Sequence, residues 1–157
     1  MRLWHTDLIH YLPRQQLLGQ HRECCALRGN GWGKKHATVD FVFKHPISYL
    51  VAYHRAVMFE MRLRGYHHNV AWLFNDYRGK HFLGKLEEVN IPDLPGSIYP
   101  EMNNKYFWRD VADLEKRGCK HLFLEKDEKD NVNAFRRQVE YAKFINENME
   151  NNNGSEA

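Results

Sequence analysis

Apolar positions recur along this chain at the spacing of amphipathic helices, which predicts a mostly helical protein. The first such segment starts after Pro13, because proline suits the first turn of a helix. One side of it carries Leu17, His21, Cys24, Cys25 and Arg28. Another side carries Gln15, Gly19, Arg22 and Ala26, with Glu23 alongside. Gly29, Gly31 and Gly33 end the segment and begin a basic loop, Lys34-Lys35-His36.

A second helix is predicted from Pro46 to Gly65. Its apolar stripe consists of Ile47, Leu50, Val51, His54, Val57, Met58 and Met61. A histidine on such a stripe is more typical of a hydrogen-bonded core residue than of a metal ligand. We therefore expect His54 to lie in the core.

Two more helices are predicted, over residues 101–117, ended by Gly118, and over residues 131–148. Residues 67–99 contain Pro92 and Pro95 and lack a helical pattern, which favours a structured, functional loop region. Residues 150–157 have the composition of a disordered tail. The expected fold is all-α: a compact single-domain bundle of three to four helices with long irregular connections, spanning residues 1–149.

Composition narrows the class of protein. The chain has 157 residues, 43% of them hydrophobic, which fits one globular domain. No apolar run approaches the ~18 residues needed to span a bilayer, and charged and histidine residues interrupt the N-terminus where a signal peptide would be apolar. Three cysteines do not make a disulfide framework. We expect a monomer without a membrane partner, in a reducing cytoplasm: at the nucleoid in a bacterium, or in the host cytoplasm for a phage protein.

Charge is distributed unevenly between the two halves. The net charge is +3, but residues 1–68 hold ten Lys and Arg against four Asp and Glu. This excess predicts a basic N-terminal face that contacts a polyanion such as nucleic acid.

The usual catalytic motifs are missing. The chain has no CxxC pair, HExxH, P-loop, GxGxxG or GxSxG. Its ten histidines lack the spacing of a metal site, and no acidic or cysteine ligands cluster with them in the sequence. We expect neither a metal nor an organic cofactor.

An amine and a carboxylate remain as candidate chemistry. Glu23 stands beside Arg22 in a segment whose other polar positions are neutral or basic. A carboxylate there repels phosphate, so it indicates catalysis or plain solvation rather than DNA affinity. The α-amino group of Met1 has an ordinary pKa near 7.7–8.0, so roughly a tenth of it is free base at neutral pH. Such an amine is a ready nucleophile for a sugar carbon, assisted by a carboxylate.

Several short segments together resemble one enzyme family. They are Arg22-Glu23 with Leu17-Leu18 before and Arg28-Gly29 and Lys35-His36 after, Phe43-Lys44-His45-Pro46, Met58 to Tyr66, Ile98-Tyr99-Pro100-Glu101 and Asp113 to Arg117. Their order and spacing are similar to those of pyrimidine-dimer DNA glycosylases of the phage endonuclease V type. The resemblance covers roughly residues 1–118.

The resemblance implies an all-helical, metal-free enzyme that acts on double-stranded DNA. Such an enzyme flips nucleotides out of the duplex, attacks C1′ with its N-terminal amine and nicks the strand by β-elimination. Met1 and Glu23 would be catalytic. The implied DNA contacts are Arg2, Arg22, Arg28, Lys34, Lys35, His36 and Gln16, which stands where the family has an active-site histidine.

Other interpretations stay open at this point. Arg2 after the initiator residue favours retention of Met1, whereas well-known members expose a threonine amine. Together with Gln16, this departure favours a non-catalytic nucleic-acid-binding module as the alternative. A histidine-dependent nuclease or hydrolase is a third class. A pyrimidine dimer is the default lesion, and a modified phage base is also compatible.

Overall fold

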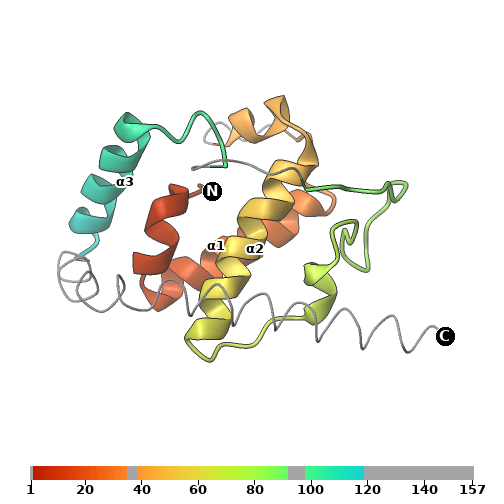
Figure 1. Cartoon of the computed structure of the whole chain (residues 1–157), viewed down its shortest axis with the longest axis horizontal. Coiled ribbons are helices and arrows are strands. Elements are labelled where there is room, and N and C mark those ends of the chain that lie inside the picture. The colour runs from red at the N-terminus through yellow and green to blue at the C-terminus, as the bar shows by residue number, and fades with distance from the viewer. Residues whose placement is uncertain (1, 35–38, 92–97, 119–157) are drawn as a thin grey trace.

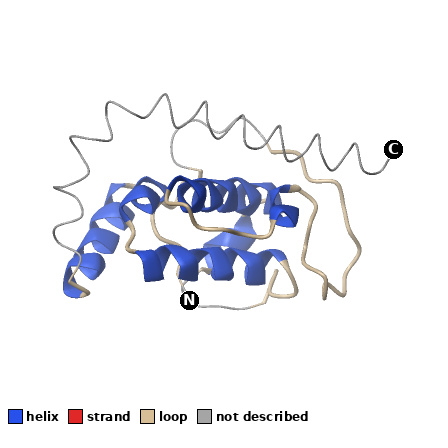
Figure 2. Ribbon diagram, turned by 90° about the horizontal axis from the view of Figure 1, so that it is seen from below, coloured by secondary structure: helices blue, strands red, loops and turns tan. Residues whose placement is uncertain are grey.

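The computed structural model describes residues 2–34, 39–91 and 98–118, which form helices joined by loops (Figures 1 and 2). Three α-helices are present in these ranges: α1 (Arg14–Arg28), α2 (Ile47–Leu63) and α3 (Asn104–Lys116). Three short 3-10 helices accompany them: η1 (Thr6–Tyr11), η2 (Asp40–Lys44) and η3 (Val70–Leu73). The described residues contain no strand, which confirms the all-α prediction.

The ends of the helices follow from local sequence chemistry. Pro13 and Pro46 stand directly before α1 and α2. After α2, Gly65 adopts a positive φ of 81°, and the Tyr66 N–H reaches back to the Met61 carbonyl oxygen at 2.8 Å. This hydrogen-bond pattern is a Schellman ending, which glycine permits without strain.

The third helix begins later than its pattern predicted. We expected it from residue 101, but α3 starts at Asn104. The Asn103 side chain accepts a hydrogen bond from the Tyr106 N–H at 3.0 Å and so caps the helix. Met102 belongs to the preceding turn, since its N–H bonds to the Tyr99 carbonyl oxygen.

Some predictions concern other parts of the chain. The predicted helix over residues 131–148, the tail and the domain boundary at residue 149 lie outside the described residues. Sequence periodicity missed η1, η2 and η3, because one or two turns of 3-10 helix are too short to show a repeat. The helices of the described residues are too short or too polar to cross a membrane.

The N-terminal segment lies inside the helical assembly. Helices α1 and α2 pack against each other, and residues 2–11 lie between this pair and α3 (Figure 1). The core that results contains residues from all these elements, including Leu3, Leu8, Leu17, Leu27, Leu50, Tyr53, Val57, Tyr99 and Leu114. Because Leu3 and Leu8 belong to this core, the first residues of the chain are part of it. Burial of each such leucine contributes about 1.5–3 kcal/mol to the stability of the fold.

Candidate active site

An open pocket of about 260 Å³ lies where α1, the N-terminal segment and the end of α3 meet. Its lining consists of Arg2, Trp4, Gln15, Gln16, Gly19, Gln20, Glu23 and Arg117. Helix α1 supplies five of these residues, from positions about one turn apart, so a single helix face forms one wall. The pocket therefore combines one carboxylate with two arginines and three amides.

The structure brings together several residues that the sequence singled out. Arg2, Gln16 and Glu23 line the same pocket, although Arg2 and Glu23 are far apart in the sequence. Arg22 is exposed, and its Nη2 lies 3.7 Å from the position that a Cβ on Gly19 would occupy. Because Gly19 lines the pocket, the Arg22 guanidinium lies at its rim. Met1 is outside the described residues, but Arg2, to which it is bonded, is in the pocket wall.

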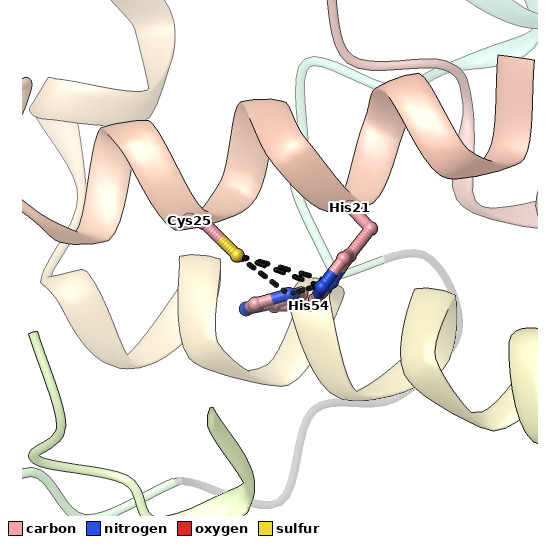
Figure 3. Close-up of side chains that lie close together, drawn as sticks. All are labelled: His21, Cys25 and His54. Atoms are coloured by element: carbon pink, nitrogen blue, oxygen red, sulfur yellow. Dashed lines mark hydrogen bonds between the residues drawn. The ribbon is translucent and has the colours of Figure 1, made fainter. Parts of the chain in front are cut away.

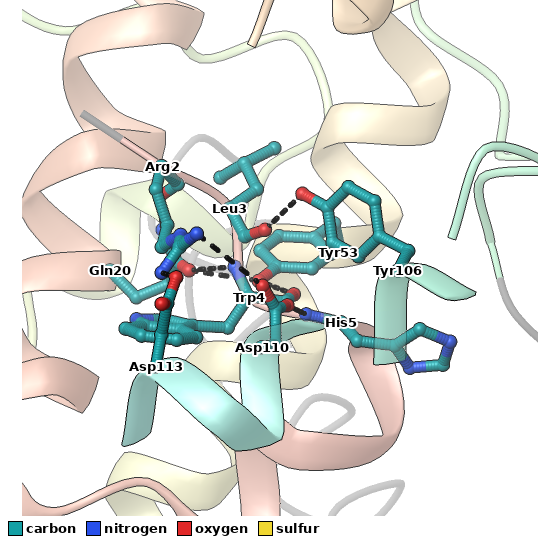
Figure 4. A network of polar contacts seen from close by, with 9 residues as sticks. All are labelled: Arg2, Leu3, Trp4, His5, Gln20, Tyr53, Tyr106, Asp110 and Asp113. Carbon is teal, nitrogen blue, oxygen red and sulfur yellow. Dashed lines mark hydrogen bonds and ion pairs between the residues drawn. The ribbon is translucent and has the colours of Figure 1, made fainter. Parts of the chain in front are cut away.

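Gln20 holds the N-terminal segment against α1 (Figure 4). Its Nε2 donates to the Arg2 carbonyl oxygen at 2.9 Å, and its Oε1 accepts from the Trp4 N–H at 2.8 Å. The Tyr53 hydroxyl donates to the Trp4 carbonyl oxygen at 2.5 Å. A buried amide thus pairs with the backbone on both sides of Leu3, much as a neighbouring strand would.

Helix α3 contacts the opposite side of the same segment (Figure 4). The Asp110 Oδ2 accepts the His5 N–H at 2.7 Å, and the Tyr106 hydroxyl donates to the Leu3 carbonyl oxygen at 2.5 Å. Burial raises the pKa of the Asp110 carboxyl, while the His5 N–H and Arg2 oppose that rise. Together with Gln20 and Tyr53, these groups fix the path of residues 2–5.

Arg2 is engaged within the protein. Its Nη1 lies 2.5 Å from the Asp113 Oδ2, and its Nη2 lies 3.7 Å from the Asp110 Oδ1. The hydrogen bond from Arg2 lowers the pKa of Asp113. The guanidinium also lies 4.5 Å from the centre of the Trp4 ring. Since 31% of the Arg2 side chain remains exposed, a phosphate contact by Arg2 would add to these partners or compete with them.

Arg28 is buried and is therefore not placed to contact a DNA phosphate. It is 0% exposed, so the expected DNA contact is not available to it in this structure. Its Nη1 donates to the Trp72 carbonyl oxygen at 2.8 Å and to His54 Nδ1 at 2.9 Å. Its Nη2 donates to the carbonyl oxygens of Phe74 and Tyr77 at 2.8 and 3.0 Å. Burial lowers the pKa of Arg28 to about 10, and its function here is to tie the loop after η3 to α1.

The expectation that no cysteine clusters with the histidines is wrong, because the fold brings Cys25 of α1 beside His21 and His54. These three form the group of described residues with the composition of a metal site (Figure 3). Two features favour a hydrogen-bonded pair instead. Because Arg28 donates to His54 Nδ1, the His54 proton lies on Nε2, which faces His21 Nδ1 at 2.8 Å. Two nitrogens on one tetrahedral zinc would stand about 3.3 Å apart and would both need a free lone pair. The nearby Arg28 charge also opposes a dication.

Of the basic loop, the structure describes Lys34. Lys34 is exposed beyond the C-terminal end of α1 and does not line the pocket. Lys35 and His36 lie outside the described residues. The neighbouring Trp32 is half-buried, and its ring packs edge-on against Phe43 at 5.1 Å between centroids.

Sequence reasoning missed Gln20 and Arg117. Gln20 resembles any polar helix residue in the sequence, and only its 2% exposure identifies it as a structural group. Arg117 lies at the C-terminal cap of α3, and the approach of α3 to the N-terminal segment brings it to the pocket. Arg117 belongs to one of the segments that carry the family resemblance, which was the available signal, but no role was assigned to it.

Comparison with known proteins adds one finding. Residues 1–74 match the model of a protein family described as pyrimidine dimer DNA glycosylase. This part of the chain is therefore similar to the pyrimidine dimer DNA glycosylases. The match confirms the resemblance over α1, α2 and η3, and the family is one of DNA repair enzymes whose substrate is DNA. Searches of curated proteins and of solved structures found no match. The matched segment supplies every residue of the pocket lining except Arg117.

Proposed function

We propose that this protein is a DNA glycosylase with abasic-site lyase activity that excises a damaged pyrimidine, by default a pyrimidine dimer. The observation that supports this most directly is the pocket shared by Arg2 and Glu23. It places the residue bonded to Met1 and the candidate carboxylate in one open site within a glycosylase-family segment.

The proposed chemistry uses the Met1 amine and the Glu23 carboxylate. The amine nitrogen forms a bond to C1′ of the damaged nucleotide, and the base leaves with the electrons of its glycosidic bond. Loss of the amine protons and opening of the sugar ring give an imine. Removal of a C2′ proton then expels the 3′ phosphate by β-elimination, and water releases the amine. Glu23 stabilises the cationic sugar and transfers protons.

The DNA contacts in this proposal are residues in the pocket and exposed cations outside its lining. Arg22 at the rim and Lys34 on the loop are exposed cations that can neutralise phosphates. Gln16 and Arg117 line the pocket itself, where they can contact the extruded nucleotide. Lys35 and His36 extend the basic loop in the sequence.

A borohydride trap tests the nucleophile. Wild-type protein and protein acetylated at its N-terminus are incubated with a duplex carrying one dimer and a duplex carrying one abasic site. We expect a covalent adduct with both duplexes for the wild type and none for the acetylated protein, whose equilibrium binding stays within about twofold because one charge is lost. A persistent adduct after acetylation would assign the nucleophile to a lysine. Binding without any adduct, even in the wild type, would instead favour the non-catalytic module.

A further inference from the structure

We propose that α3, which lies beyond the family match, is the element that aims the N-terminal amine, with Asp110 and Tyr106 as positioning residues. This inference rests on the proposed function, because it assumes that the amine is the nucleophile. The match ends at residue 74, whereas α3 spans Asn104–Lys116. The matched segment therefore depends on a later part of the chain for its own first residues.

The contacts of α3 reach the backbone of Leu3 and His5, in the segment that leads to Met1. Tyr106 bonds to the Leu3 carbonyl oxygen and Asp110 to the His5 N–H (Figure 4). Asp110 is 3% exposed and joins two points of the segment, since its other oxygen faces Arg2 at 3.7 Å. A carboxylate that accepts a backbone N–H and faces an arginine holds both in one orientation.

A second carboxylate completes this contact. Asp113 lies one turn after Asp110 and pairs with Arg2 Nη1 at 2.5 Å, so two acids of one helix face hold the residue that follows Met1. Met102, in the turn before α3, adds a further point, because its carbonyl oxygen lies 2.8 Å from His5 Nε2. The segment is therefore fixed at Arg2, Leu3 and His5 from the α3 side.

With the contacts of α1 and α2 alone, the N-terminal segment would be held by hydrogen bonds on one side only. Gln20 and Tyr53 bond to Arg2 and Trp4, but the Leu3 carbonyl and the His5 N–H face α3. An amine at the very end of a chain has more rotational freedom than a side chain on a helix. Attack at C1′ needs the nitrogen within about 3–3.5 Å along one direction, and a misplacement of 1 Å can reduce the rate about 100-fold.

The test compares the rate of adduct formation with affinity for the same DNA. We would make Asp110→Ala, Asp110→Asn and Tyr106→Phe, with Glu115→Ala as control, because Glu115 is an exposed acid on the same helix. Borohydride trapping is measured under single turnover on a duplex with one abasic site, and the dissociation constant is measured on that duplex. Thermal unfolding checks that each variant is folded.

For Asp110→Ala we expect trapping about 10- to 100-fold slower, with a dissociation constant within about twofold of wild type. Asp110→Asn should recover part of the rate, because its amide oxygen still accepts the His5 N–H but no longer attracts Arg2. Tyr106→Phe should slow trapping less than Asp110→Ala, and Glu115→Ala should match the wild type. Hydrogen exchange of the His5 amide should be faster in Asp110→Ala than in Glu115→Ala.

Two results would overturn the inference. Trapping by Asp110→Ala and Tyr106→Phe at the control rate would show that α3 does not aim the amine, while loss of the adduct on acetylation would still support the proposed function. A rate loss matched by an equal loss of affinity would show that α3 acts on DNA binding. If Asp110→Ala does not fold, Asp110→Asn and Tyr106→Phe decide. Retention of the adduct after acetylation is the separate result that removes the proposed function itself.

Discussion

Helix α1 carries two clusters of polar residues, one in an open pocket and one enclosed within the protein. Glu23 lines an open pocket with Arg2, so a ligand that enters the pocket can contact it. Arg28, little more than one turn later on a different side of the helix, is enclosed by His54 and by carbonyl oxygens of η3 and of the loop after it. Both residues are charged members of one helix, yet one belongs to a site and the other to the core.

The comparison shows that charge alone does not identify a DNA-binding residue. The carbonyl oxygens and the imidazole around Arg28 use four of its N–H groups, so no free side of its guanidinium faces solvent. Arg22 bears the same charge, but it is exposed at the rim of the pocket. The predictions below test whether substitutions in the pocket change catalysis, and whether substitutions in the enclosed cluster change the stability of the fold.

The largest expected effect follows from removal of the carboxylate in the pocket. Glu23→Gln should reduce base release by about 10²–10⁴-fold, because the amide can neither transfer protons nor stabilise the cationic sugar by charge. DNA affinity should stay the same or rise, since a negative charge near phosphate is lost. Single-turnover base release and equilibrium binding on a dimer-containing duplex would be measured. Full activity of this variant on both dimer and abasic substrates would place the catalytic group elsewhere.

The second prediction concerns the enclosed cluster. Arg28→Met should lower the free energy of unfolding by about 3–5 kcal/mol, because buried carbonyl oxygens and the His54 Nδ1 lose their donors. Arg22→Met is the matched control and should change stability by less than about 0.5 kcal/mol while weakening DNA binding. Urea unfolding and DNA titrations would show the two effects. A destabilisation by Arg22→Met as large as that by Arg28→Met would remove the distinction between the clusters.

The third prediction is a loss of stability in acid. Burial lowers the pKa of His21 to about 4 from an ordinary 6.5, and burial also lowers the pKa of His54. Between pH 6.5 and about pH 4, the unfolded chain binds more protons at these histidines than the folded chain does. The stability of the fold therefore decreases as the pH drops from 6.5 toward 4.

A histidine variant separates this effect from general acid denaturation. His21→Gln removes one titrating group and keeps an acceptor for the His54 N–H, so its melting temperature should fall less steeply over that pH range. His81→Gln, at an exposed position, should keep the wild-type slope. Equal slopes for His21→Gln and the wild type would mean that the pair does not control acid stability.

The smallest effect concerns the basic loop. Replacement of Lys34 and Lys35 together should reduce the slope of log affinity against log salt by about two units, because two phosphate contacts are lost. Binding would be titrated at several salt concentrations. An unchanged slope would place the DNA-binding surface away from this loop.

Much of the helical framework could be read from the sequence. The prolines before α1 and α2, and the glycines after them, act within a few residues, so the expected ranges agree closely with the observed ones. The grouping of α1 residues by side also has a counterpart in the structure: Leu17, Cys24 and Arg28 from one predicted side are buried, and Gln15, Arg22 and Ala26 from the other are exposed. The sequence did not indicate which side faces the core, and the resemblance had implied a DNA contact for Arg28.

Local sequence determined the helices and their caps, because each depends on residues within a turn or two of one another. The family resemblance also came from the sequence, through the order and spacing of short segments along the chain. Tertiary structure decided which charges remain available. The pairing of His5 with Asp110 joins residues 105 positions apart, and that of Arg28 with Tyr77 joins residues 49 apart. Such contacts depend on how the whole chain packs, and no local repeat encodes them. The amine–carboxylate idea came from the sequence, but the pocket, and the part of α3 in forming it, required the fold.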